Sequence, residues 1–283
     1  MGGERASVWA HPGCKDGVKQ MKNHIRTESS LLSHLEPEPA GTYNLHVDSP
    51  WLFLCEHACN RIPQSLNKLG LPQSEIDRHI GWDIGILDVA KGMVKHLNAP
   101  LIFQQYSRLV IDCNRSLENS DLIPVVSEKT QIPGNQNLET ADRENRINEI
   151  WKPYQQFIKQ YLLNKKCNRV VSMHSFTPVF KGKRRPWHIG LLYNRDKRMA
   201  LALKNILKKH DPSLIIGMNN PYTISGEEDY TIPEFGEATG LPHVLVEVRQ
   251  DLINKKQNIT QWIDLFTRAY QDLENIFTER KIN

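Results

Sequence analysis

Three apolar, strand-like segments of this chain each end near a residue that can bind a metal or transfer a proton. WLFLCEH ends at His57, RVVSMHS contains His174, and HVLVEVRQD carries Glu247 close to its end. Side chains at the carboxyl ends of strands in an α/β sheet border the crevice where such folds bind ligands. Because the three residues share that position, we expect them to form one metal-dependent hydrolase site.

The two histidines leave the third metal ligand open. A catalytic zinc ion usually has three protein ligands and one open position. We choose Asp83 in HIGWDIG, which lies among apolar residues at the start of a predicted helix. An acidic residue there could also merely compensate the helix dipole. Glu56 is the competitor, but strand alternation turns it away from its neighbour His57.

A hydrolase of this kind also needs a general base within hydrogen-bonding distance of the attacking water. Glu247 interrupts the apolar run VLVEV, where a buried carboxylate is costly unless a metal or an arginine lies nearby. Its alternative role is an ion pair with Arg249, two residues along the same strand face. We favour the catalytic role.

Arginines are dense in the segment YSRLVIDCNRS. It carries Arg108 and Arg115, with Asn114 beside the second. Arginine binds carboxylates through two parallel hydrogen bonds, so this segment suits an acidic substrate or a developing oxyanion. Further contacts from loops are expected of Arg184, Arg185 and Arg195.

Bulk properties narrow the class of protein. The chain has 283 residues, 39% of them hydrophobic, and a formal net charge of +4. Its basic residues are scattered, which does not favour a nucleic-acid partner. No stretch is long and apolar enough for a membrane span, and residues 1–30 lack the apolar core of a secretory signal. The odd number of cysteines argues against a disulfide scaffold. We therefore expect a cytoplasmic protein with free thiols.

The order of elements predicts one α/β domain over residues 46–283, after a flexible leader of residues 1–45. Predicted strands are Trp51–Glu56, Leu101–Gln105, Leu109–Asp112, Arg169–Met173, Ile189–Tyr193, Leu214–Ile216 and Val244–Val248. Predicted helices lie within Glu75–Leu97, from Thr140 onward with a kink or split at Pro153, over Lys197–Lys209 and over Ile259–Phe277. This alternation indicates a three-layer sandwich with a mostly parallel mixed sheet and helices on both faces. Long loops at 116–139 and 219–240 are expected to form the substrate pocket.

Taken together, eight segments resemble the N-formylglutamate amidohydrolase family, and specifically its broad N-formylglutamate amidohydrolase-like branch. They run from about Trp51 to Ile253 and are LCEHACNRIP, RHIGWDIG, YSRLVIDCNR, IPGN, VSMHSFTPV, WHIGLLYNRD, NNPYTISGEEDYTIPEFGE and LPHVLVEVRQDL. The resemblance implies a zinc-exopeptidase-like fold of the phosphorylase/hydrolase type. It also implies hydrolysis of the C–N amide bond of a small acidic N-acyl amino acid, such as N-formylglutamate.

A more distant similarity to the zinc carboxypeptidases implies individual roles. His57 and His174 become zinc ligands, Asn114 and Arg115 hold the substrate carboxylate, and Glu247 activates the water. Arg108 joins Glu247 as a catalytic residue in this interpretation. Further substrate contacts are expected of Arg249, Tyr193 and Arg195.

One position departs from the carboxypeptidase pattern. Those enzymes have a glutamate three residues after the first histidine, and this chain has Asn60. That departure is the reason for choosing Asp83 as the third ligand, and it leaves open a divalent metal other than zinc.

Two rival functions follow from the same residues. The first is a binding or sensing module that kept the fold and lost the metal, which Asn60 favours. The second is a metal-free cysteine amidase in which His57 activates the nearby Cys59.

Overall fold

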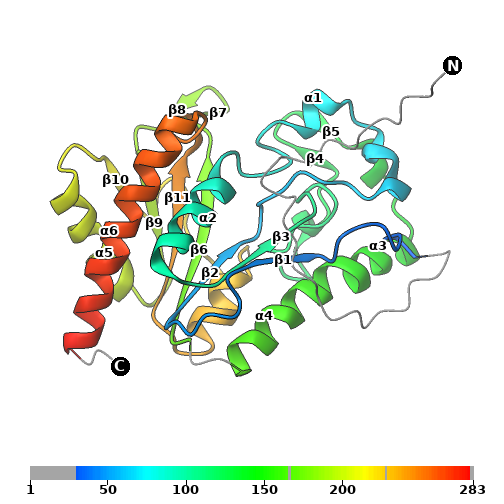
Figure 1. The fold of residues 1–283 in the computed structure, drawn as a ribbon. Coiled ribbons are helices and arrows are strands. Elements are labelled where there is room, and N and C mark those ends of the chain that lie inside the picture. Colours follow the sequence, from blue (N-terminus) through cyan, green and yellow to red (C-terminus); the bar gives the residue numbers. More distant parts are fainter. Residues whose placement is uncertain (1–29, 165–166, 227, 281–283) are drawn as a thin grey trace, which may run out of the picture.

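The computed structural model describes residues 30–164, 167–226 and 228–280. Their centre is a seven-stranded sheet in the order β1-β3-β2-β6-β11-β9-β10 (Figure 1). Its strands are β1 Ala40–Tyr43, β2 Trp51–Cys55, β3 Leu101–Gln104, β6 Arg169–Phe176, β9 Ile189–Leu192, β10 Ile216–Met218 and β11 His243–Arg249. Neighbours run parallel except at β1–β3 and β11–β9. The predicted mostly parallel mixed sheet is confirmed.

Helices cover both faces of this sheet. They are α1 Gln73–Ile76, α2 Ile86–Leu97, α3 Thr140–Arg146, α4 Lys152–Asn164, α5 Arg198–His210 and α6 Lys256–Arg280. The apolar faces of α2, α5 and α6 pack on one side of the sheet, and α4 packs on the other (Figure 1). On α6 the buried positions Trp262, Phe266, Tyr270, Leu273 and Phe277 recur at helical spacing. The α/β three-layer arrangement is therefore confirmed.

The helix that begins at Thr140 is interrupted where its sequence predicts. A π-helical turn at Ile147–Trp151 separates α3 from α4, immediately before Pro153. Proline has no backbone N–H and its ring crowds the preceding turn, so a regular α-helix cannot continue through it unchanged. The wider turn accommodates it.

One predicted strand was wrong, and part of the predicted leader forms a strand of the sheet. Leu109–Asp112 is a buried turn rather than a strand, with Val110 N bonded to Ser107 O at 2.9 Å. A short apolar run does not distinguish a strand from a buried turn, and the place beside β3 is taken by β1. Because Ala40–Tyr43 forms β1, these residues belong to the sheet and not to the leader. The first 29 residues of that leader lie outside the described part of the chain.

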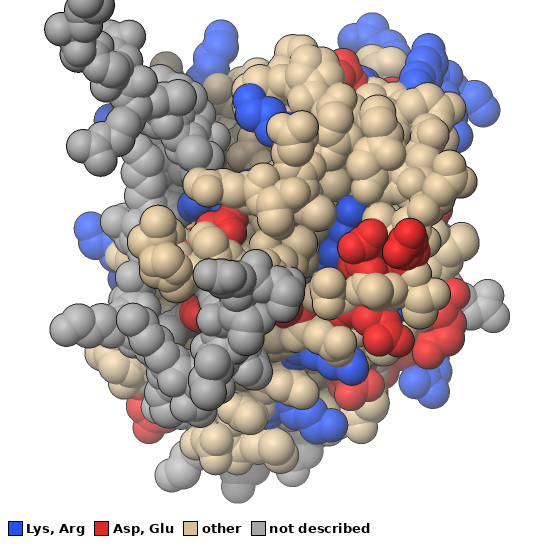
Figure 2. Space-filling model, turned by 90° about the vertical axis from the view of Figure 1, so that its right-hand side faces the viewer, with Lys and Arg blue, Asp and Glu red and all other residues tan. Residues whose placement is uncertain are grey.

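The remaining short elements lie in loops outside the seven-stranded sheet. Two small hairpins are β4 Val126–Ser127 with β5 Thr130–Gln131, and β7 Val179–Phe180 with β8 Lys183–Arg184. The predicted loop 116–139 thus contains its own hairpin, and the loop 219–240 contains a π-helical segment at Ile232–Glu237. None of the helices that the structure describes is long and apolar enough to cross a membrane. Most of the surface drawn in Figure 2 is uncharged, with basic and acidic side chains both present.

Strand direction determines which side chains meet. β2, β6 and β11 are parallel neighbours, so their carboxyl ends lie at one edge of the sheet. In the β6–β11 register His174 lies directly opposite Glu247, and residues in register on adjacent strands point to the same face. β9 runs antiparallel to β11, so its carboxyl end lies at the other edge.

Candidate metal centre and active site

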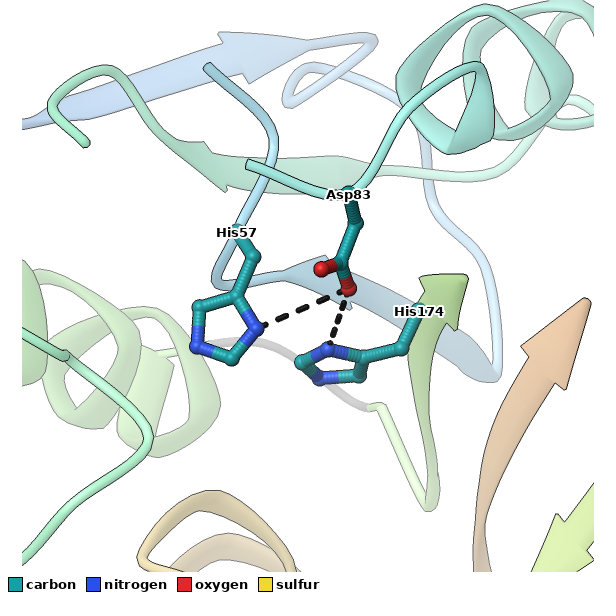
Figure 3. A group of neighbouring side chains, drawn as sticks. All are labelled: His57, Asp83 and His174. Carbon is teal, nitrogen blue, oxygen red and sulfur yellow. Dashed lines mark hydrogen bonds and ion pairs between the residues drawn. The ribbon is translucent and has the colours of Figure 1, made fainter. Parts of the chain in front are cut away.

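His57, Asp83 and His174 form one compact, buried cluster at the carboxyl edge of β2 and β6 (Figure 3). Asp83 Oδ2 lies 2.9 Å from His174 Nδ1 and 3.5 Å from His57 Nδ1. All three candidate ligand atoms are within 4.8 Å of one another. Ligands around a tetrahedral zinc ion, at bond lengths near 2 Å, are separated by about 3.3 Å. The cluster is thus close to the spacing that a divalent cation requires.

Backbone contacts fix Asp83 between the two strand ends. Its amide N–H donates to the carbonyl of His57 at 2.8 Å, and its Oδ2 accepts from the amide of Ser175 at 3.1 Å. The turn that follows needs Gly85, whose φ is +82°. A Cβ at that residue would lie 2.2 Å from the carbonyl oxygen of Ile253, so a larger residue would push the turn away.

Each imidazole has a buried carboxylate beside Nε2, the ring nitrogen that faces away from Asp83. His57 Nε2 lies 2.7 Å from Asp112 Oδ1, and His174 Nε2 lies 2.9 Å from Glu56 Oε2. The His57 Nε2–Asp112 contact is a hydrogen bond and the His174 Nε2–Glu56 contact is an ion pair when the ring is protonated, and both leave Nδ1 to face Asp83. Metal-binding histidines characteristically carry such a carboxylate partner, because it fixes the ring and raises its basicity. This arrangement fits a metal ion better than it fits isolated structural histidines.

The electrostatics of the cluster favour positive charge. Burial alone would raise the pKa of Asp83, but the charges and hydrogen bonds of His57 and His174 outweigh it and hold the pKa below its ordinary value. Burial alone would lower the pKa of His174, yet its contacts with Asp83 and Glu56 hold it well above the ordinary value. Carboxylates that stabilise an imidazolium in this position also stabilise a bound cation.

Arg108 lies at the entrance to the cluster. Its Nη2 donates to Asp112 Oδ2 at 2.7 Å, and its Nη1 lies 3.2 Å from His57 Nδ1 and 3.8 Å from Asp83 Oδ1. The side chain is 27% exposed, so the guanidinium combines a fixed buried partner with access to the cavity. A cation held in this way can stabilise negative charge that develops on a substrate oxygen.

Glu247 shares a cavity of about 160 Å³ with the cluster. Its side chain is buried, and its Oε2 makes no hydrogen bond within the described ranges. Burial raises the pKa of Glu247 to about 8, against the opposing charge of His174. An unpartnered carboxylate with a pKa near neutrality beside a candidate metal centre has the properties of a general base.

The wall facing Glu247 depends on a glycine in β9. Gly190 is the cross-strand partner of Glu247, and a Cβ on it would lie 2.2 Å from the carbonyl oxygen of Asn220. Because this position has no side chain, the segment after Asn220 passes close over the strand. Tyr222 and Thr223 then line the cavity. The loop 219–240 therefore contributes to the pocket as predicted.

Asn114 and Arg115 also line this cavity. Asn114 Oδ1 accepts from the amide of Thr231 at 3.0 Å, and its Nδ2 donates to Asp229 Oδ1 at 3.1 Å. Arg115 Nη1 donates to the carbonyl of Glu228 and lies 3.5 Å from Asp229 Oδ1. Asn114 thus holds the loop 219–240 in place, whereas Arg115 is 23% exposed and offers its guanidinium to the cavity.

Three predicted substrate contacts lie elsewhere. Arg249 Nε donates to Asp251, and its Nη1 donates to the carbonyls of residues 185–187, so it anchors a loop. Tyr193 and Arg195 follow β9, whose antiparallel direction carries them to the opposite edge of the sheet. There Arg195 is 78% exposed and pairs with Glu237 at 3.1 Å.

The alternative ligands and nucleophile are also placed away from the cluster centre. Asn60 Nδ2 donates to Asp77 Oδ1 at 2.9 Å, and Glu56 supports His174 from behind. Cys59 is 1% exposed, is disulfide-bonded and is not among the residues lining the cavity, so the expectation of a free thiol is wrong at this residue. This position does not suit a nucleophile that must reach a substrate.

Sequence reasoning missed Asp112 and Tyr222. Asp112 ends the apolar run LVIDC, the same signal that drew attention to the other strand ends, but Arg108 and Arg115 dominated that segment. Tyr222 lies in a loop rich in glycine and proline, where no periodicity marks a single position. It enters the site because the chain folds back over Gly190.

Substitution of Glu56 tests whether the buried carboxylates that contact the two imidazoles strengthen metal binding. Glu56→Gln is expected to weaken zinc binding by about 10–100-fold, because the neutral amide no longer fixes or polarises the His174 ring. The dissociation constant is measured by competition with a chromophoric chelator. Ser172→Ala is the control, since it removes the 2.7 Å hydrogen bond to Glu56 Oε2 and keeps the carboxylate. Equal affinities in Glu56→Gln and the parent protein would contradict this role.

The fold and this edge of the sheet define an α/β enzyme with a buried candidate metal centre. The sequence profile of the N-formylglutamate amidohydrolase family matches residues 49–254. The chain therefore belongs to the N-formylglutamate amidohydrolase family, whose members are hydrolases acting on linear amide bonds. The predicted family and the predicted class of enzyme are both confirmed.

Solved structures have the same fold. The gene product Atu2144 from Agrobacterium tumefaciens is 32% identical, with a TM-score of 0.79 over 86% of this chain and 99% of that chain. An N-formylglutamate amidohydrolase from Ralstonia eutropha JMP134 is 15% identical, with a TM-score of 0.64 over 86% of this chain and 100% of that chain, and it shows the same fold. No curated protein sequence matches the chain.

Proposed function

We propose that this protein is a divalent-metal-dependent amidohydrolase that cleaves the C–N bond of a small acidic N-acyl amino acid, of the N-formylglutamate type. One observation carries the proposal. Two imidazoles and a carboxylate lie within 4.8 Å of one another, and both imidazoles have buried carboxylates beside Nε2. His57, Asp83 and His174 are the proposed ligands, and zinc is the expected metal.

The chemistry divides between the cluster and Glu247. His57, Asp83 and His174 would hold a divalent cation, whose positive charge would polarise the acyl carbonyl and favour the ionised form of Glu247. Glu247 accepts a proton from the water that attacks the acyl carbon. It then donates that proton to the leaving nitrogen as the C–N bond breaks, giving a carboxylic acid and a free amino acid.

The arginines orient the substrate. Arg115 faces the cavity from the loop side and is the proposed partner of the substrate carboxylate. Arg108, anchored on Asp112, is the proposed donor to the carbonyl oxygen as negative charge develops there. Holding both ends of the substrate reduces the entropic cost of reaching the reactive geometry.

The proposal is tested with N-formyl-L-glutamate and the purified full chain. We expect formate release that a chelator abolishes and that added Zn²⁺ restores. Alkylation with iodoacetamide should leave the rate unchanged, since the proposed mechanism uses no thiol. A rate that survives metal removal and falls on alkylation would favour the cysteine amidase. Tight, stoichiometric binding of the substrate without turnover, with or without metal, would favour the binding module.

A further inference from the structure

A second cavity, of about 190 Å³, adjoins the candidate metal centre at Asp83. Asp83, Arg108, Ser175 and Tyr222 line both this cavity and the one that contains Glu247. Arg115 and Glu247 line the first cavity and not the second. A substrate whose reacting carbonyl is at the cluster therefore has room on two sides.

Three aromatic side chains, Phe176, Phe180 and Tyr222, line part of the second cavity. Phe176 at the end of β6 is 2% exposed, and Phe180 projects from the β7–β8 hairpin. The guanidinium of Arg185 lies 5.8 Å from the ring of Phe176, 4.6 Å from Phe180 and 4.8 Å from Tyr222. Its Nη1 also donates to the hydroxyl of Tyr222 at 2.9 Å. These contacts place three aromatic rings around the guanidinium of Arg185.

Another part of the lining comes from the β4–β5 hairpin and the turn before α2. Ser127 and Glu128 line it together with Ile80. Glu128 Oε2 accepts from Arg78 Nη2 at 2.5 Å, and Arg78 Nη1 also donates to Glu75 at 2.5 Å, so one guanidinium serves two carboxylates. The lining is mixed: the rings of Phe176, Phe180 and Tyr222 and the side chain of Ile80 share it with polar side chains, among them His79, Ser127 and Thr177.

The size of this cavity does not match a formyl group. A cavity needs roughly 10–15 Å³ to hold one water molecule, and a formyl group is of similar size. The volume of 190 Å³ is therefore about an order of magnitude larger than a formyl group requires. An aromatic acyl group fills such a space and gains from burial of its ring.

We propose that the second cavity is an acyl subsite, and that this protein prefers N-acyl amino acids with an aromatic acyl group over N-formyl ones. This inference rests on the proposed function, since it assumes that the carboxylate of the substrate is held by Arg115. With that end fixed in the first cavity, the acyl group on the other side of the scissile C–N bond must enter the second. Phe176, Phe180 and Tyr222 then contact its ring.

The test compares N-formyl-, N-acetyl- and N-benzoyl-L-glutamate as substrates of the zinc-loaded full chain. We expect kcat/KM for the benzoyl substrate to exceed that for the formyl substrate by about tenfold or more, because its ring is buried against Phe176, Phe180 and Tyr222. Ser127→Phe, which places a ring into the cavity from β4, should lower kcat/KM for the benzoyl substrate at least about tenfold and change the formyl value little. Val126→Phe is the matched control, because alternate residues of a strand point to opposite faces and Val126 does not line the cavity.

Binding gives a second readout. Calorimetric titration of Glu247→Gln with N-benzoyl-L-glutamate should show weaker binding when Ser127→Phe is added to it. A parent enzyme that prefers the formyl substrate would overturn the acyl subsite and leave the proposed function standing, as would equal losses for both substrates in Ser127→Phe. Absence of turnover with all three substrates would overturn the proposed function and the subsite with it.

Discussion

Glu247→Gln is expected to lower kcat by about 10²–10⁴-fold, the range that a positioned general base contributes. Glutamine keeps the shape of the side chain and its place in β11, but it cannot accept a proton from water. Because Glu247 is not a member of the His57–Asp83–His174 cluster, metal stoichiometry and KM should remain close to the parent values. Steady-state kinetics and elemental analysis of the same preparation measure both.

The same substitution has a distinctive effect on stability in the presence of a chelator. Burial raises the pKa of Glu247 from 4.5 to about 8, so the folded state favours the protonated carboxyl. The parent protein therefore loses stability as the pH rises from about 4.5 through 8, and the glutamine variant does not. Near pH 9 the variant should be more stable by about 1–3 kcal/mol, and near pH 4 the two should be equal.

Thermal unfolding across this pH range provides the measurement. Exposed Glu144→Gln is the control, and its stability should follow that of the parent protein at every pH. If Glu247→Gln retains the parental kcat, Glu247 is not the base. If its unfolding temperature follows the parent at all pH values, the carboxylate is not held in a desolvated position.

Substitution of His57, Asp83 or His174 is expected to cause a large loss of zinc affinity. Loss of a carboxylate that contacts a metal-binding histidine weakens metal binding by roughly 10–100-fold. His57→Ala and His174→Ala should each weaken zinc binding by more than this, and activity should fall in parallel. Each substitution removes a proposed ligand and also leaves its carboxylate partner, Asp112 or Glu56, buried without the imidazole. Asp83→Asn tests the third ligand with the smallest change in volume.

His243→Ala is the matched control for these variants. His243 is a buried histidine on the same sheet, 1% exposed, but it lies at the amino end of β11 and its Nδ1 contacts the carbonyl of Leu241. Its loss should leave zinc affinity unchanged while producing a comparable cavity. Equal metal content in His243→Ala and His174→Ala would show that His174 is not a ligand.

Local signals in the sequence were sufficient for the central features of the site. Apolar runs of strand length ended at His57 and His174 and contained Glu247, and parallel strands necessarily bring such ends to one edge of a sheet. The same periodicity gave the fold class, because buried strands and amphipathic helices alternate along the chain. The resemblance of eight segments to one family added the class of reaction.

Other features depended on contacts between distant parts of the chain. Asp83 joins the histidines because its backbone bonds to His57 and its side chain accepts from Ser175, 92 residues later. The second cavity exists because the β4–β5 and β7–β8 hairpins meet Tyr222 around it. Neither arrangement leaves a periodic trace in the sequence.

The direction of a strand is a clear example of a feature that the sequence does not predict and the tertiary structure decides. The segment ending in Tyr193 and Arg195 has the composition of the other strands, and only its antiparallel pairing with β11 sends those residues to the far edge. A buried strand has the same hydrophobic pattern in either direction, since burial depends on which side chains face the core and not on where the chain enters. The sequence by itself therefore determined the strand ends that carry His57, His174 and Glu247. The tertiary structure decided which other side chains reach them.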